Sequence, residues 1–226
     1  MSNNKVARLT ASQQIPGIMS ELQTAADTLK EIGWGVSVFG SARLRPDSPY
    51  YKISEIIGSR LAKAGLTVIA GGGPGAMEAA NKGAFEAGGN SVGLNIKLPH
   101  ETSNNRFQTH SLNFDYFYSR KATFFMHSAA YIALPGGFGT LDELFEVLTL
   151  VQTRKVPPAP IILIGTQFWT GLTDWIREQL LANKLIGPHD LHLLTVTDDI
   201  DLAMRRIESF CADFAHEREA APALPE

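Results

Sequence analysis

Short apolar runs alternate with longer stretches of helical period along the chain. We expect strands at Val36–Phe39, Thr67–Ala70, Ser91–Asn95, Ala130–Leu134, Ile161–Ile164 and Leu193–Val196. We expect helices at Ile18–Ile32, Pro49–Ala64, Ala76–Ala87, Tyr116–Ser128, Thr140–Thr153, Phe168–Asn183 and Asp198–Phe210. The strands are almost unbroken in hydrophobicity, as buried parallel strands are. The pattern therefore predicts an α/β fold, a doubly wound parallel sheet in a three-layer α/β/α sandwich.

No linker rich in Pro, Gly or Ser divides the sequence, so we expect a single domain over residues 1–226. The ends, about 1–14 and 215–226, are polar or Ala-rich, and we expect them to be flexible. The segment Leu98–Phe114 is the one long connection without a clear element. Long loops of this kind are often functional.

Composition narrows the function classes. Lys and Arg number 20 against 23 Asp and Glu, so this slightly acidic chain is a poor candidate for non-specific nucleic-acid binding, which needs a basic face. The single cysteine, Cys211, excludes a disulfide framework, and the six histidines form no recognisable metal motif. No apolar run reaches about 18 residues, and the first residues form no signal-peptide core. We expect a soluble cytoplasmic protein without a metal, a membrane or a nucleic-acid partner.

Two glycine-rich loops follow predicted strands, and each precedes a helix. They are Gly71–Gly75 and Pro135–Thr140. In open parallel sheets, ligands bind beyond the carboxyl ends of the strands. Glycines let the backbone approach a ligand closely, and a helix N-terminus favours an anion. Either loop could be only a tight turn, but together they indicate a phosphorylated ligand.

Standard nucleotide motifs fit this sequence poorly. Neither loop has the Gly-Lys-Ser/Thr of a Walker A loop. Gly71, Gly73 and Ala76 match the looser pattern G-x-G-x-x-A of dinucleotide sites. That pattern expects a carboxylate at the end of the next strand, where this chain has Asn95-Ile96-Lys97. A redox dinucleotide site is therefore disfavoured.

Polar residues near the predicted strand ends are candidates for ligand contact. After the first strand, Ser41 can donate a hydrogen bond and Arg43 can pair with an anion, although a polar turn would explain both. Glu78 starts the helix after the first glycine loop, where the helix dipole also favours an acid.

Two residues could carry chemistry, Glu143 and Arg120. Thr140 and Glu143 fit a capping box, so Glu143 has either a capping or a catalytic role. Arg120 is either an exposed base or a ligand contact. A carboxylate beside a bound phosphate could stabilise the oxocarbenium-like state of glycosidic cleavage. If the two residues lie close together, we expect Arg120 to keep Glu143 ionised.

Three blocks of the sequence resemble the Lonely Guy (LOG) family. They are Gly71–Asn81, Tyr118–Lys121 and Pro135–Glu143, and the last matches the family signature PGGxGTxxE. The resemblance runs from about Val36 to Ile200. It implies a Rossmann-like fold and a phosphoribohydrolase, which cleaves a nucleoside 5′-monophosphate, a cytokinin riboside or AMP-like compound, into free base and ribose 5-phosphate.

The resemblance also assigns roles to residues. It implies catalysis by Arg120 and Glu143, with a phosphate loop at Gly136, Gly137, Gly139 and Thr140. From their places near the same strand ends, we also expect substrate contacts from Ser41, Gly72, Gly73, Gly75, Glu78 and Lys121. Asn104, Asn105 and Arg106 are candidates for the base pocket. No cofactor is implied, and the protein is expected to form a homodimer or larger assembly with the site near the interface.

Two other functions are weighed against this reading. Family members are often labelled lysine decarboxylases, but nothing in the sequence marks a Schiff-base lysine. The same broad superfamily includes non-catalytic molybdenum-cofactor carriers with similar glycine loops. Binding without turnover would favour a carrier.

Overall fold

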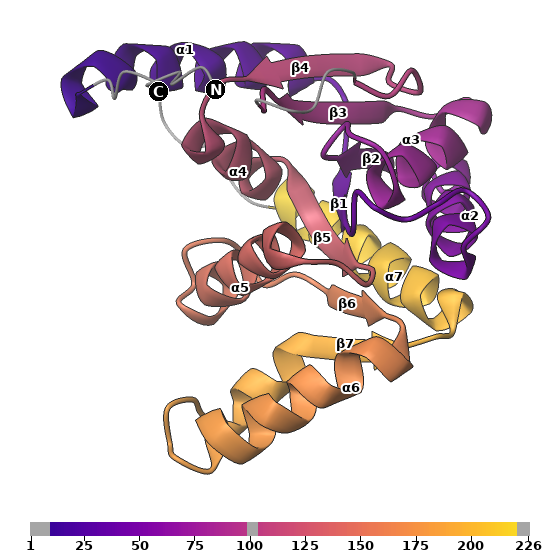
Figure 1. Cartoon of the computed structure of the whole chain (residues 1–226), viewed down its shortest axis with the longest axis vertical. Helices are drawn as coiled ribbons and strands as arrows, with labels where there is room; N and C mark the ends of the chain where they lie inside the picture. The colour runs from indigo at the N-terminus through magenta and orange to yellow at the C-terminus, as the bar shows by residue number, and fades with distance from the viewer. Residues whose placement is uncertain (1–9, 99–103, 221–226) are drawn as a thin grey trace, which may run out of the picture.

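The structure, a computed structural model, describes residues 10–98 and 104–220. Within these ranges, seven parallel strands form one sheet in the order β4-β3-β2-β1-β5-β6-β7 (Figure 1). The strands are β1 Gly35–Phe39, β2 Thr67–Ala70, β3 Ser91–Ile96, β4 His110–Phe114, β5 Ser128–Ala133, β6 Ile161–Ile164 and β7 Leu194–Thr197. The chain winds outward from β1 to β4, then returns to the other side of β1 with β5. The expected doubly wound sheet is confirmed.

Helices cover both faces of the sheet (Figure 1). One layer contains α1 Ala11–Leu29, α4 Phe117–Met126, α5 Phe138–Gln152 and α6 Thr166–Trp175. The other contains α2 Pro49–Lys63, α3 Ala76–Glu86 and α7 Ile200–Ala220. A π-helical turn, Ile176–Leu181, prolongs α6, and a 3₁₀ helix, Pro188–Leu193, leads into β7. The three-layer α/β/α sandwich is thereby complete.

Burial on both faces explains why the strands read as apolar runs. In β2, Val68 and Ala70 belong to the core beside α2, α3 and α7, whereas Ile69 belongs to the core on the other face. Successive strand residues point to opposite faces, so a strand covered on both sides needs apolar residues throughout. Trp169, fully buried, anchors α6 to the sheet.

The strand β4 corrects the expected long loop Leu98–Phe114. It pairs with β3 from His110 to Phe114. Leu112 and Phe114 are buried, but Ser111 and Asn113 are exposed. This is an edge strand with one covered face, so its apolar signal is half that of the inner strands. Of the expected loop, residues 99–103 lie outside the described ranges.

Two helices extend into the ends for which flexibility was expected. Helix α1 starts at Ala11, seven residues before the expected start, and the Thr10 N–H donates to Gln13 Oε1 (2.8 Å). Helix α7 continues to Ala220. Residues 1–9 and 221–226 lie outside the described ranges.

Helix α1 packs against the start of α4. Glu21 of α1 accepts hydrogen bonds from the Asp115 backbone N–H (2.7 Å) and from the Ser119 hydroxyl. One turn earlier, Gly17 lies against the Tyr116 ring, where a Cβ atom would come within 2.7 Å of Cε2. The first helix therefore fixes the position of α4, which carries Arg120.

Candidate active site

A cavity of about 880 Å³ lies beyond the carboxyl ends of β1, β2, β3 and β5. The sheet order reverses between β1 and β5, which is where open parallel sheets bind ligands (Figure 1). Seven predicted site residues line this cavity: Ser41, Gly73, Arg120, Gly137, Gly139, Thr140 and Glu143. The structure therefore brings together residues that are up to about 100 positions apart in the sequence.

Arg120 is buried and tethered at the floor of the cavity. Its Nε donates to the Leu94 carbonyl (2.7 Å), and its Nη2 donates to the Gly71 carbonyl (3.3 Å). The guanidinium also lies 5.4 Å from the centre of the Phe124 ring. A Cβ atom on Gly71 would come within 2.4 Å of Nη2, so the absence of a side chain there makes room for Arg120.

Glu143 on α5 faces Arg120 across the cavity. Arg120 Nη1 lies 3.6 Å from Glu143 Oε1, and the two side chains are 8% and 14% exposed. Burial raises the pKa of Glu143 from 4.5 to about 7, and Arg120 offsets only part of the rise. The expectation that Arg120 keeps Glu143 ionised is therefore wrong, since desolvation outweighs the ion pair. At neutral pH, Glu143 can both accept and donate a proton.

The start of α5 excludes a capping role for Glu143. The N-cap of α5 is Gly137, and the helix begins at Phe138. Thr140 is therefore the third helical residue, and no capping box forms between Thr140 and Glu143. Gly137 contributes no side-chain cap, which leaves the first N–H groups of α5 without one, and Gly137, Gly139 and Thr140 line the cavity. These groups and the helix dipole favour an anion.

The loop Gly71–Gly75 forms the adjacent wall. Gly72 and Gly75 have φ values of 76° and 69°, in the left-handed region that favours glycine. The Asn105 backbone N–H donates to the Gly72 carbonyl (2.8 Å), and its side chain donates to Gly73 (3.2 Å). The Ala76 N–H donates to the Ser41 carbonyl (3.0 Å). These bonds hold the loop against its neighbours on both sides.

Comparison with known proteins shows the family of this chain. A family model described as "Possible lysine decarboxylase" matches residues 77–207. The cytokinin riboside 5′-monophosphate phosphoribohydrolase of Mycobacterium tuberculosis is 30% identical over 177 residues, 76% of this chain and 92% of that protein. The Arabidopsis thaliana enzyme of that name, LOG1, is 28% identical over 176 residues, 76% of this chain and 80% of that protein. This chain belongs to the LOG family.

A solved structure with a different printed function shares the fold of this LOG chain. The molybdenum cofactor carrier protein of Chlamydomonas reinhardtii matches 80% of this chain and 99% of that chain, with a TM-score of 0.59 and 22% identity. At that identity the likeness shows the fold alone. No helix in the described ranges is long and apolar enough to cross a bilayer, and the same ranges hold no group of three His, Cys, Asp or Glu residues that could hold a metal ion.

Several predicted residues of the LOG motifs lie away from the cavity. Glu78 lines a neighbouring cavity of about 540 Å³ and accepts a hydrogen bond from Tyr51 Oη (2.9 Å). Lys121 forms ion pairs with Asp142 (3.1 Å) and Glu146 (2.6 Å) between α4 and α5. The loop residues Gly72, Gly75 and Gly136 are not among the residues that line the cavity of about 880 Å³.

Other lining residues were given no role in the sequence analysis. Asn95 is buried at the end of β3, and its side chain bonds with Gln108 on the way to β4. Phe138 is 92% exposed, and Phe117 is 49% exposed. In the sequence, the signal that could identify Phe138 is its place as an aromatic residue between two motif glycines, Gly137 and Gly139. Of the base-pocket candidates, Asn104 lines both cavities, whereas Asn105 and Arg106 line only the smaller one.

Proposed function

We propose that this LOG protein hydrolyses the N-glycosidic bond of nucleoside 5′-monophosphates, releasing free base and ribose 5-phosphate. The observation that carries the proposal is the buried Arg120–Glu143 pair beside the uncapped start of α5. Cleavage of a nucleoside 5′-monophosphate calls for an anion site for the phosphate and, beside it, a carboxylate for the sugar, and this arrangement supports both roles. The relatives named as phosphoribohydrolases support the same reaction.

In the proposed reaction, the N–H groups at the start of α5 hold the 5′-phosphate. The ribose then lies toward Arg120 and Glu143. The Glu143 carboxylate stabilises positive charge as the bond from C1′ to the base nitrogen breaks. It also takes a proton from the water whose oxygen bonds to C1′. Because its pKa is about 7, Glu143 can pass that proton to the leaving base, so the atoms balance without a second acid.

The base is proposed to lie against the aromatic residues of the cavity. Phe138 and Phe117 expose ring surface there, and stacking on such a ring is worth roughly 1–3 kcal/mol per base. An apolar substituent on the base, such as the isopentenyl group of a cytokinin, would add apolar contact. We therefore propose cytokinin riboside monophosphates as substrates alongside AMP-like nucleotides.

The test is product formation from AMP, CMP and isopentenyladenosine monophosphate without added metal. Free base and ribose 5-phosphate in equal amounts are the expected products, and an Arg120→Ala variant is the matched control. Absence of turnover on every nucleotide would contradict the proposal. Stoichiometric binding of a nucleotide without turnover would favour the carrier function instead.

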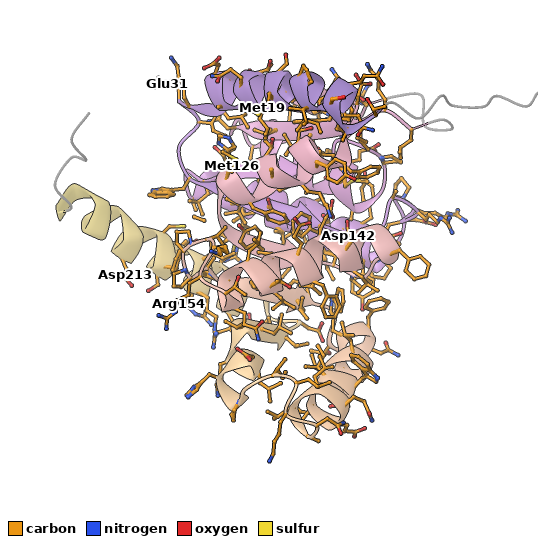
Figure 2. The ribbon with its side chains drawn as sticks, turned by 90° about the vertical axis from the view of Figure 1, so that its left-hand side faces the viewer. Met19, Glu31, Met126, Asp142, Arg154 and Asp213 are labelled. Carbon is orange, nitrogen blue, oxygen red and sulfur yellow. The ribbon has the colours of Figure 1, made fainter. Side chains whose placement is uncertain are left out.

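We also propose that the protein forms a homodimer through the face built by α1 and α4. Exposed apolar residues gather on these two helices, including Met19 (61% exposed), Tyr118 (69%) and Met126 (67%). Figure 2 shows Met19 and Met126 on the same side of the molecule. Met126→Glu is expected to shift a dimer to monomer in sedimentation, whereas Leu185→Glu, on a distant exposed residue, leaves it unchanged. A monomeric wild type would contradict the proposal.

A further inference from the structure

Among the residues that the structure describes, three cationic side chains line the large cavity, and they are not equivalent. They are Arg43, Lys97 and Arg120. Arg120 is held by two backbone carbonyls and by Glu143. Lys97 forms an ion pair with Asp115 (2.9 Å). Among the described residues, Arg43 has no acidic partner, and its side chain is exposed. Of the three, Arg43 is therefore the cation that no described acidic residue balances.

The position of Arg43 is set by bonds between two neighbouring loops. The Arg43 N–H donates to Ser41 Oγ (3.1 Å), and the Ser41 N–H donates to the Pro135 carbonyl (3.1 Å). Pro135 opens the glycine loop that precedes α5. Arg43 follows β1 and the glycine loop follows β5, and these two strands are neighbours in the sheet. Arg43 is therefore close to that loop. Lys97 follows β3, three strand spacings or about 14 Å from β5.

Charge balance shows what the start of α5 lacks. A helix N-terminus presents about half a positive charge, whereas a phosphate monoester carries about −1.5 to −2 at neutral pH. The planar fork of an arginine matches two phosphate oxygens. We propose that Arg43 recognises the 5′-phosphate, while Arg120 serves the catalytic centre. This assignment rests on the proposed function and names the phosphate monoester as the group that Arg43 selects.

The test compares a nucleoside 5′-monophosphate with the corresponding nucleoside. Arg43→Ala is expected to lower kcat/KM for the monophosphate by roughly 10- to 100-fold, mainly through KM, because a charged hydrogen bond is lost. Its kcat/KM for the nucleoside stays at the wild-type value. The matched control is Arg45→Ala: Arg45 pairs with Asp47 on the same loop and does not line the cavity. An unchanged monophosphate rate, or an equal loss on both substrates, would overturn the assignment.

A binding measurement separates this assignment from the proposed reaction. Calorimetric titration with ribose 5-phosphate and with ribose requires no turnover. The assignment predicts that Arg43→Ala weakens ribose 5-phosphate by the same roughly 10- to 100-fold factor and that Arg45→Ala does not. Equal affinity of all three proteins for ribose 5-phosphate, or no binding by the wild type, would refute it. A wild type that binds ribose 5-phosphate but hydrolyses no nucleotide would refute only the proposed reaction.

Discussion

Gly71→Ala is expected to disable the site by displacing Arg120. The added Cβ would stand 2.4 Å from Arg120 Nη2, whereas ordinary contact begins at 3.4 Å. The Met77 side chain is also too close, at 2.3 Å, but a thioether can turn aside. The guanidinium must therefore withdraw by about 1 Å, which loosens its bond to the Gly71 carbonyl. A misplacement of this size costs about 100-fold in rate.

The assay is kcat/KM on the best nucleotide, measured beside the urea midpoint for unfolding. The control is Gly171→Ala on α6, where an added Cβ meets no atom within 4 Å and alanine favours the helix. Withdrawal of Arg120 also takes its positive charge away from Glu143, so the pKa of Glu143 in the pH–rate profile should rise above about 7. A folded Gly71→Ala protein with activity within about twofold of wild type would refute the reasoning.

Three further predictions concern the charged pairs. Glu143→Gln should abolish turnover yet stabilise the protein by up to about 3 kcal/mol at pH 8, with no such gain at pH 4. Urea unfolding at both pH values measures this difference, and an equal effect at the two pH values would contradict the raised pKa of Glu143. The sign follows because between pH 4.5 and about 7 the folded state keeps a proton that the unfolded chain releases, so the free energy of unfolding falls as pH rises. In wild type, kcat/KM should rise with pH through about 7, as the ionised carboxylate forms; a profile that rises near pH 4.5 would be inconsistent with this role. Lys121→Ala removes the ion pairs to Asp142 and Glu146 and should cost about 1 kcal/mol in thermal unfolding, with kcat/KM falling less than for Arg120→Ala.

Local pattern was enough to predict the inner strands and the glycine loops. The apolar runs of β2 and β6 are confirmed to the residue, because strands buried on both faces must be apolar throughout. Strand β4 was missed, since Ser111 and Asn113 face outward and its pairing with β3 is a tertiary contact. Edge strands leave only a short alternating signal.

The site needed the tertiary structure for a different reason. The motifs named Arg120 and Glu143 as candidates, but the pKa of Glu143 depends on how much water is excluded, which no spacing reveals. The capping-box spacing was misleading because α5 starts at Phe138 rather than after Thr140. The need for Gly71 likewise arises from Arg120, which is 49 residues away in the chain.

The strand order has a consequence for folding during synthesis. β1 is synthesised first but occupies the middle of the sheet, and one of its edges stays unpaired until β5 has been synthesised. About 63 residues separate the end of β2 from the end of β5, which is about 3–13 s of translation at typical ribosome speeds. Throughout that interval the nascent chain carries an unpaired apolar strand edge. Chaperone occupancy should therefore peak on ribosomes stalled between β2 and β5, before any active site can assemble.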